Sequence, residues 1–141
     1  MNLIKKIIDS DLDIDIYGRN LNLSDKRYKG SPDNKHEILK NYQYSIAIEN
    51  SCEENYVSEK FFDCILNNVV PLYYGCPNID SIFNSKCYKF LDINDNKVIN
   101  NIKNICLKDS KDFEKDVLDA KNKYFETYNP IIRITNEIKC C

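Results

Sequence analysis

The residues best suited to chemistry lie in the segment 44–62, where a strand-like run is followed by polar groups and then by a helical run. The strand end delivers a carboxylate, an amide and a hydroxyl, from Glu49, Asn50 and Ser51. The helical run carries Lys60 in its first turn. Because the free N–H groups of a helix N-terminus attract anions, an ammonium group beside them favours phosphate binding. The segment therefore predicts an anion-binding site.

Lys60 also has a simpler interpretation as a surface residue. A lysine in the first turn opposes the helix dipole, at a cost of about a few tenths of a kcal/mol. Asp63 follows three residues later, at a spacing that lets the two side chains pair on a solvated helix face. The local pattern leaves both interpretations open.

The sequence offers no convincing set of metal ligands. It has one histidine, His36, and none of its seven cysteines form a Cys-x-x-Cys pair, so the spacing of a structural zinc site is missing. Two Asp-x-Asp matches lie between Asp11 and Asp15, but they open a strand-like run and alternate onto one face. We expect a solvated strand face there and no metal site. The cysteines are expected to be mostly small buried apolar residues in a reducing compartment.

The elements that position these groups alternate between two kinds of run. Periodicity predicts strands over 13–17, 44–49, 69–74 and 87–91, and helices over 57–68, 98–106 and 113–128. Ser58 is the expected N-cap of the first of these helices, and the polar segment 20–35 is expected to be a loop. The alternation predicts an α/β fold with a parallel, Rossmann-like sheet flanked by helices.

In such sheets, ligands bind beyond the carboxyl ends of the strands. Three polar or glycine-containing segments follow predicted strands, at 18–19, 49–51 and 75–76. We therefore expect these segments to share one edge of the sheet.

Length and charge narrow the function classes. The chain has 141 residues, 43% of them hydrophobic, which is enough for one domain with a full core. Its 20 Lys and Arg against 22 Asp and Glu leave a net charge of −2, which argues against a nucleic-acid partner. No run approaches the about 20 apolar residues of a membrane helix, and aspartates interrupt any signal-peptide core. The composition therefore predicts a soluble, cytoplasmic chain.

Four stretches together resemble glycosyltransferase family 10, the α-1,3/1,4-fucosyltransferases. The family pattern Glu-Asn-Ser followed by Tyr-x-Thr-Glu-Lys is matched by ENS at 49–51 and YVSEK at 56–60. NNVVPLYYGCPN at 67–78 is similar to the family's Val-Pro-aromatic-Gly-x-Pro segment, and DIDIYGRN at 13–20 to its Asp-x-Tyr-Gly-Arg turn. The resemblance spans about residues 10–95, and the combination is specific although each piece alone is weak.

The resemblance implies the C-terminal, nucleotide-sugar-binding half of a GT-B glycosyltransferase. It implies GDP-fucose as the donor substrate, a glycan as the acceptor, no cofactor, and inverting transfer of fucose to a sugar hydroxyl. By matching the family motif it gives the donor contacts Asn50, Tyr56, Glu59 and Lys60, with Arg19, Ser51 and Gly75 as additional candidates. Lys60 would face the diphosphate, and Glu59 would accept hydrogen bonds from sugar hydroxyls.

The chain also departs from the family pattern. The family's catalytic base lies in an N-terminal half, and a family arginine that contacts the diphosphate would fall just before Met1, so we assign no catalytic residue here. Residues 1–128 are expected to form the GDP-sugar-binding domain and 129–141 a C-terminal helix or tail. We expect the domain to need a separate N-terminal half, and a Golgi location if it is a fragment of a eukaryotic member.

Two other functions stay open. A non-catalytic nucleotide-sugar-binding remnant or regulatory module would bind GDP without supporting transfer. A response-regulator-like domain would need acidic residues after the first strand and an aspartate after the third, where Gly18 and Gly75 stand.

Overall fold

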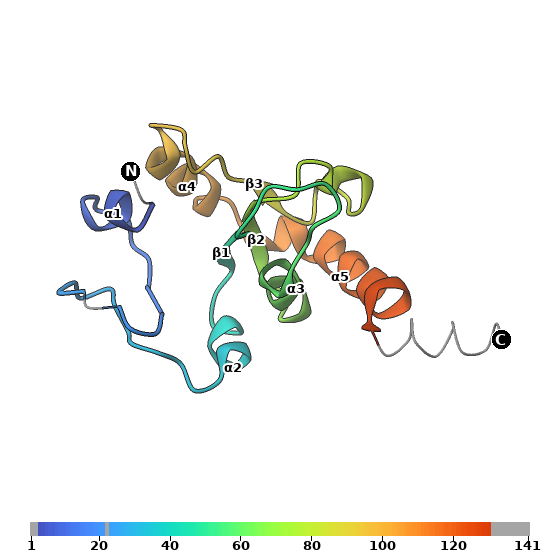
Figure 1. The fold of residues 1–141 in the computed structure, drawn as a ribbon, viewed down its shortest axis with the longest axis horizontal. Coiled ribbons are helices and arrows are strands. Elements are labelled where there is room, and N and C mark those ends of the chain that lie inside the picture. The colour runs from blue at the N-terminus through green and yellow to red at the C-terminus, as the bar shows by residue number, and fades with distance from the viewer. Residues whose placement is uncertain (1–2, 22, 131–141) are drawn as a thin grey trace.

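The computed structural model describes residues 3–21 and 23–130. Short helices and strands alternate along this part of the chain, as Figure 1 shows. The α-helices are α1 (Leu3–Ile8), α2 (Lys35–Leu39), α3 (Glu59–Leu66), α4 (Val98–Cys106) and α5 (Glu114–Lys123), and the strands are β1 (Tyr44–Ile48), β2 (Val70–Tyr74) and β3 (Lys89–Phe90). Two 3₁₀ turns, Ile79–Ser81 and Ser110–Phe113, and a π-helical turn, Tyr124–Tyr128, complete the list.

The three strands form one parallel sheet in the order β1-β2-β3. The register places Tyr44 opposite Val70 and Ile48 opposite Tyr74, so β1 and β2 end together. The strands predicted at 44–49 and 69–74 are confirmed, and the one predicted at 87–91 is shorter than expected. β2 is central and nearly fully buried, as expected of a strand covered on both faces.

Helices cover both faces of the sheet. On one face, α3 and α5 pack on a core that includes Ala47, Phe61 and Tyr73. On the other face, α1 and α4 pack on a second core that includes Leu72 and Ile102. Figure 1 shows these two pairs of helices on opposite sides of the strands. The predicted parallel sheet flanked by helices is therefore confirmed.

Helix α3 forms where its local signals indicate. Ser58 has an extended backbone and its hydroxyl accepts a hydrogen bond from the N–H of Lys60, as expected of an N-cap. Phe61 and Ile65, four residues apart, are both completely buried. The cap and the apolar face together fix where the helix begins and which side faces the sheet.

The strand predicted at 13–17 is wrong. Ile16 makes only an isolated parallel bridge to Tyr28, in which its N–H donates to the carbonyl of Arg27 at 2.7 Å. A cavity of about 890 Å³ lies between this segment and β1, and both Ile14 and Ile46 line it. The apolar alternation thus reflects burial against α1 and α4, while the hydrogen bonds go to a polar loop rather than to the sheet.

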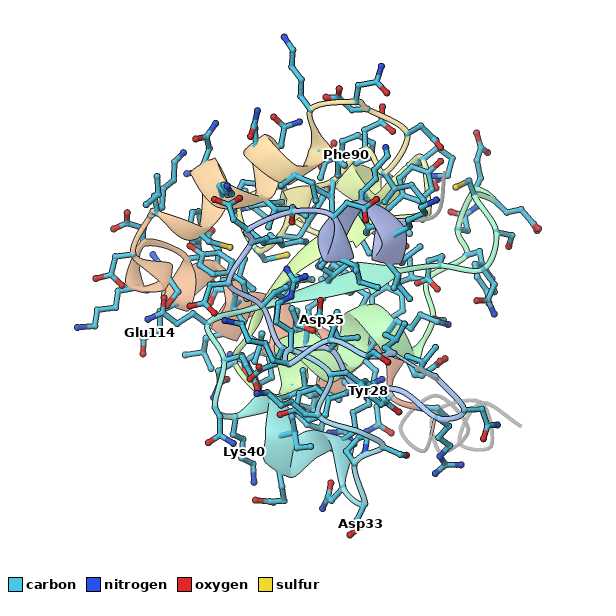
Figure 2. All side chains as sticks on the ribbon, turned by 90° about the vertical axis from the view of Figure 1, so that its left-hand side faces the viewer. Asp25, Tyr28, Asp33, Lys40, Phe90 and Glu114 are labelled. Carbon is cyan, nitrogen blue, oxygen red and sulfur yellow. The ribbon has the colours of Figure 1, made fainter. Side chains whose placement is uncertain are left out.

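The loop that carries Tyr28 is anchored by its neighbour Arg27. The Arg27 guanidinium donates to the carbonyls of Ile7, Ile8, Ser10 and Leu12 and pairs with Asp25 at 2.6 Å. Figure 2, viewed from this side of the molecule, shows Asp25 and Tyr28 on it. The last carbonyls of α1 are therefore satisfied by a side chain from a loop about 20 residues away.

The C-terminal part differs from a single helix over 113–128. A 3₁₀ turn precedes α5, and a π-helical turn follows it. Most of the tail predicted at 129–141, namely residues 131–141 with Cys140 and Cys141 among them, lies outside the described residues. No helix among the described residues has the length and apolar character needed to cross a membrane.

Candidate functional site

The carboxyl ends of β1 and β2 meet at the edge where a ligand site was predicted. The N–H of Glu49 donates to the carbonyl of Tyr74 at 2.8 Å, which continues the strand ladder by one residue. Gly75 follows directly and is buried against Glu49. The predicted neighbourhood of segments 49–51 and 75–76 is therefore confirmed.

Glu49 is the centre of a buried network at this edge. Its side chain is 0% exposed. One carboxylate oxygen accepts the Ser58 N–H at 2.8 Å and the Tyr73 hydroxyl at 3.3 Å, and the other accepts the Ser58 hydroxyl at 2.5 Å. The Tyr73 hydroxyl in turn accepts the N–H of Cys76 at 3.1 Å. Burial raises the pKa of Tyr73, so this hydroxyl keeps its proton.

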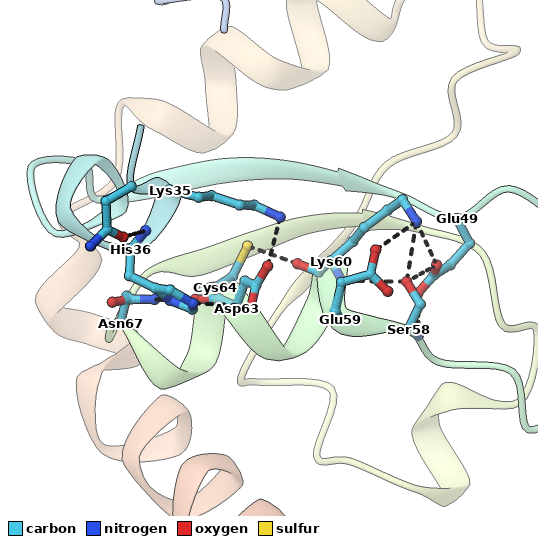
Figure 3. A network of polar contacts seen from close by, with 10 residues as sticks. Lys35, His36, Glu49, Ser58, Glu59, Lys60, Asp63, Cys64 and Asn67 are labelled. Atoms are coloured by element: carbon cyan, nitrogen blue, oxygen red, sulfur yellow. Dashed lines mark hydrogen bonds and ion pairs between the residues drawn. The ribbon is translucent and has the colours of Figure 1, made fainter. Parts of the chain in front are cut away.

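The amine of Lys60 lies at the outer side of this network (Figure 3). Its Nζ donates to the Ser58 hydroxyl at 3.3 Å and lies 3.3 Å from a Glu59 oxygen and 3.9 Å from a Glu49 oxygen. The Lys60 side chain is 27% exposed and that of Glu59 is 68% exposed. The ammonium group thus stands between one buried and one exposed carboxylate, with a side open to solvent.

The alternative pairing of Lys60 with Asp63 is wrong. Asp63 instead accepts from the amine of Lys35, at 2.6 Å, on the side of α3 that faces α2 (Figure 3). The pKa of Glu59 is lowered by hydrogen bonds from its own N–H and then from Lys60. Glu59 is therefore a charged, exposed acceptor at the first turn of α3.

The loop between β1 and α3 carries the other predicted contacts. Asn50 and Tyr56 are exposed on it, and Ser51 is partly buried. Asn55, which has a φ of 62°, fastens the loop to the segment after β2. Its N–H donates to the Asn78 side-chain oxygen at 2.9 Å, and the Asn78 amide donates back to its side-chain oxygen at 3.0 Å. Asn50 and Tyr56 are thus presented by a loop that this pair of hydrogen bonds fastens to the segment after β2.

Tyr74 and its neighbours extend this edge. The Tyr74 hydroxyl accepts the Asn94 amide at 3.0 Å, and a hydrogen bond with Cys52 raises the pKa of Tyr74. The ring of Phe90, which is exposed, lies 6.4 Å from that of Tyr74. Polar and aromatic groups therefore border the loop that carries Asn50 and Tyr56.

Arg19 is not brought to this edge. It lines a separate hollow of about 320 Å³ with Pro32 and Asp33, which precede α2, and with Lys35, the first residue of α2. The expectation that 18–19 shares the edge depended on the strand at 13–17, which the sheet does not contain. The structure therefore brings Glu59, Lys60 and Gly75 close to Glu49, and leaves Arg19 elsewhere. Asn50, Ser51 and Tyr56 lie on the loop that joins Glu49 to Ser58.

Two residues of the network, Glu49 and Tyr73, were not among the expected donor contacts, although Glu49 was noted as a carboxylate at the strand end. A signal for Glu49 was present, since strand alternation puts it on the same face as Ser45 and Ala47. Small residues on one face of a strand let a helix approach closely, so a carboxylate on that face is expected to be buried under the helix. Among the described residues, no group of three or more His, Cys, Asp or Glu side chains is arranged to hold a metal ion.

Comparisons with known proteins place the chain in a family. The model for the C-terminal part of glycosyltransferase family 10 (fucosyltransferase) matches residues 1–125. A putative fucosyltransferase-like protein of Arabidopsis thaliana is 35% identical over 80 residues, which are 57% of this chain and 15% of that protein. An α-(1,3)-fucosyltransferase of Helicobacter pylori is 34% identical over 64 residues, which are 45% of this chain and 13% of that protein.

A solved structure described as an α1,3-fucosyltransferase with GDP-fucose superposes with a TM-score of 0.51 and 25% identity. The match covers 63% of this chain and 27% of the solved one. The chain therefore spans less than a third of each of these relatives, and it superposes on part of a GT-B enzyme. On this evidence the chain belongs to the C-terminal part of glycosyltransferase family 10, the fucosyltransferases.

Proposed function

We propose that this chain binds GDP-fucose and forms the donor-binding part of an inverting fucosyltransferase that acts on a sugar hydroxyl of a glycan. The observation that carries the proposal is the position of the Lys60 amine. It stands partly exposed at the first turn of α3, beside the carboxyl edge of a parallel sheet. A helix N-terminus and an ammonium group together attract a diphosphate.

The neighbouring groups have chemistry that suits the rest of the donor. Glu59 is charged and exposed, so it can accept hydrogen bonds from fucose hydroxyls once the diphosphate replaces it beside Lys60. Asn50 and Tyr56 are exposed on the loop above the edge and can contact the sugar and phosphate. During transfer, the Lys60 charge would stabilise the diphosphate as the bond to fucose breaks.

The acceptor hydroxyl must lose a proton to a general base. We assign that base to a separate N-terminal half, which would also bind the acceptor, and not to this chain. The chain covers 27% of the solved relative that was crystallised with GDP-fucose, so most of such an enzyme lies beyond these residues. We therefore expect donor binding by the chain alone and transfer only with the complementary half.

Thermal unfolding with four nucleotides tests the donor assignment. GDP-fucose and GDP at about 100 times their dissociation constants should add roughly 2.7 kcal/mol of stability, a rise in Tm of several degrees. UDP-glucose and CMP-sialic acid at the same concentrations should have little effect. A larger shift with either of these two would contradict the proposal.

Two variants test the role of Lys60. Lys60→Met keeps the aliphatic stem but removes the amine, so it should abolish most of the GDP-induced shift while the Tm without ligand changes little. Lys35→Met is the matched control, because Lys35 also pairs with a carboxylate on α3 but belongs to α2. GDP binding without fucose transfer, even with the complementary half supplied, would instead indicate a non-catalytic nucleotide-sugar-binding module.

A further inference from the structure

We propose that Glu49 is a positioning residue that holds the Lys60 amine at the sheet edge through the hydroxyl of Ser58. This inference rests on the proposed function, because the amine is positioned for the diphosphate of GDP. Glu49 itself is completely buried, and we assign it no contact with the ligand.

The first step of the argument is that the Glu49 carboxylate is fully committed inside the protein. Burying a carboxylate away from water costs roughly several kcal/mol of free energy unless hydrogen bonds and a counter-charge satisfy it. Ser58 supplies two donors, Tyr73 supplies a third, and the Lys60 ammonium lies 3.9 Å away. Glu49 therefore fixes Ser58 firmly.

The second step concerns the direction of the Ser58 hydroxyl. A hydroxyl has one proton and two lone pairs. The proton is given to Glu49 at 2.5 Å, so the lone pairs remain for Lys60. They accept both the N–H and the Nζ of Lys60, each at 3.3 Å. The buried carboxylate thus determines which way the hydroxyl points, and the hydroxyl determines where the amine rests.

The third step separates Glu49 from Glu59. Both carboxylates face the Lys60 amine, but Glu59 is largely exposed and can turn away when a diphosphate arrives. Glu49 and Ser58 are locked by the strand end and the helix cap and keep their positions. The buried pair therefore keeps the amine in place while the exposed carboxylate exchanges with the ligand.

Glu49→Gln is the main test. The glutamine amide would donate to the Ser58 hydroxyl and occupy a lone pair that Lys60 uses, while the side-chain volume stays the same. We expect the dissociation constant for GDP, measured by isothermal titration calorimetry at fixed ionic strength, to rise about tenfold. In a Lys60→Met background the same substitution should change it less than twofold. Asp63→Asn, which removes a carboxylate of α3 that pairs with Lys35, should leave GDP binding unchanged.

The double-mutant comparison distinguishes positioning from general support. An equal loss of GDP affinity with and without the Lys60 amine would assign Glu49 a merely structural role and overturn the inference. Unchanged or tighter GDP binding by Glu49→Gln would also overturn it. If Lys60→Met binds GDP as well as the unchanged chain does, the proposed donor site itself is wrong, which is a different result.

Ser58→Ala keeps the inference testable if Glu49→Gln does not fold. It removes the hydroxyl but keeps the Ser58 N–H that Glu49 accepts. We expect GDP to bind at least threefold more weakly to Ser58→Ala, and we expect this loss to disappear in the Lys60→Met background. A loss that persists in that background, or no loss at all, would contradict the proposal that Glu49 positions Lys60 through the Ser58 hydroxyl.

Discussion

Gly75 lies directly against the side chain of Glu49. A Cβ atom built on Gly75 would stand 2.3 Å from Cγ and 2.7 Å from Cβ of Glu49, and 2.8 Å from the Tyr73 hydroxyl. All three distances are shorter than real contacts of such atoms, so a side chain here would displace the network. The glycine after β2 thus leaves room for the buried carboxylate at the end of β1.

Gly75→Ala should therefore disturb both stability and ligand binding. Overpacking of this kind costs about 1–3 kcal/mol, and the shift of Glu49 should loosen the Lys60 amine and weaken GDP binding. Urea unfolding and calorimetry with GDP measure the two effects. Gly30→Ala is the control, because the positive φ of 84° strains an alanine there but no atom of the described residues lies within 4 Å of its Cβ. It should lower stability and leave GDP binding unchanged.

Asn78→Ala should release the loop between β1 and α3. The substitution removes the acceptor of the Asn55 N–H and the donor to the Asn55 side chain, which costs about 1 kcal/mol. Hydrogen exchange should then accelerate in the peptide 50–57. Asn96→Ala, in the exposed turn before α4, should not change exchange in that peptide. Equal exchange in the Asn78→Ala and unchanged chains would show that the loop is held by other contacts.

The elements around the site could be predicted where the signals are local. Ser58 caps α3 because a hydroxyl beside the first free N–H groups is a local feature, and the apolar spacing of Phe61 and Ile65 sets the buried face. The alternation in β1 places Ala47 under α3 in the same way. These features depend on residues within one or two turns or strands.

The sequence could not predict contacts chosen by the three-dimensional arrangement. The Asp13–Tyr17 run alternates like a strand, but only the packing shows that its hydrogen bonds go to residues 27–29. Asp63 pairs with Lys35, which is 28 residues away, rather than with the nearer Lys60. Helical spacing alone cannot choose between a local partner and a distant one.

Arg27→Lys should destabilise the N-terminal part of the protein. The guanidinium reaches two carbonyls at the end of α1 and two in the segment after it with its fork of donors, whereas a lysine amine can reach only some of them. We expect Tm to fall by about 5 °C or more, measured by circular dichroism. Lys26→Met, at the adjacent exposed position, should change Tm by less than about 1 °C. A similar Tm for Arg27→Lys would contradict this account.

Asp25 should contribute to stability in a pH-dependent way. The hydrogen bond from the Arg27 side chain holds the pKa of Asp25 well below its ordinary value in the folded state. The folded protein therefore binds a proton at Asp25 less readily than the unfolded chain does. The stabilisation that Asp25 provides is present at neutral pH and is lost as pH falls below about 4. The stability difference between the unchanged chain and Asp25→Asn should thus be larger at pH 6 than at pH 3. Urea unfolding at both values measures it, and a constant difference would show that the pair is not linked to protonation.

Thiol labelling should separate the cysteines by their burial. Burial raises the pKa of Cys64 to about 11 and that of Cys87 to about 12, so neither has a reactive thiolate near neutral pH. Among the cysteines that the structure describes, N-ethylmaleimide at pH 7.5 should therefore modify the exposed Cys52 and Cys106 first, and Cys87 only after unfolding in urea. Peptide mass spectrometry gives the rate at each site.

Because Cys52 follows Ser51 in the loop at the proposed donor site, GDP should slow its labelling, with Cys106 as the internal control. Fast labelling of Cys87 in the native protein would contradict its burial, and equal slowing at Cys52 and Cys106 would place the effect of GDP outside the loop.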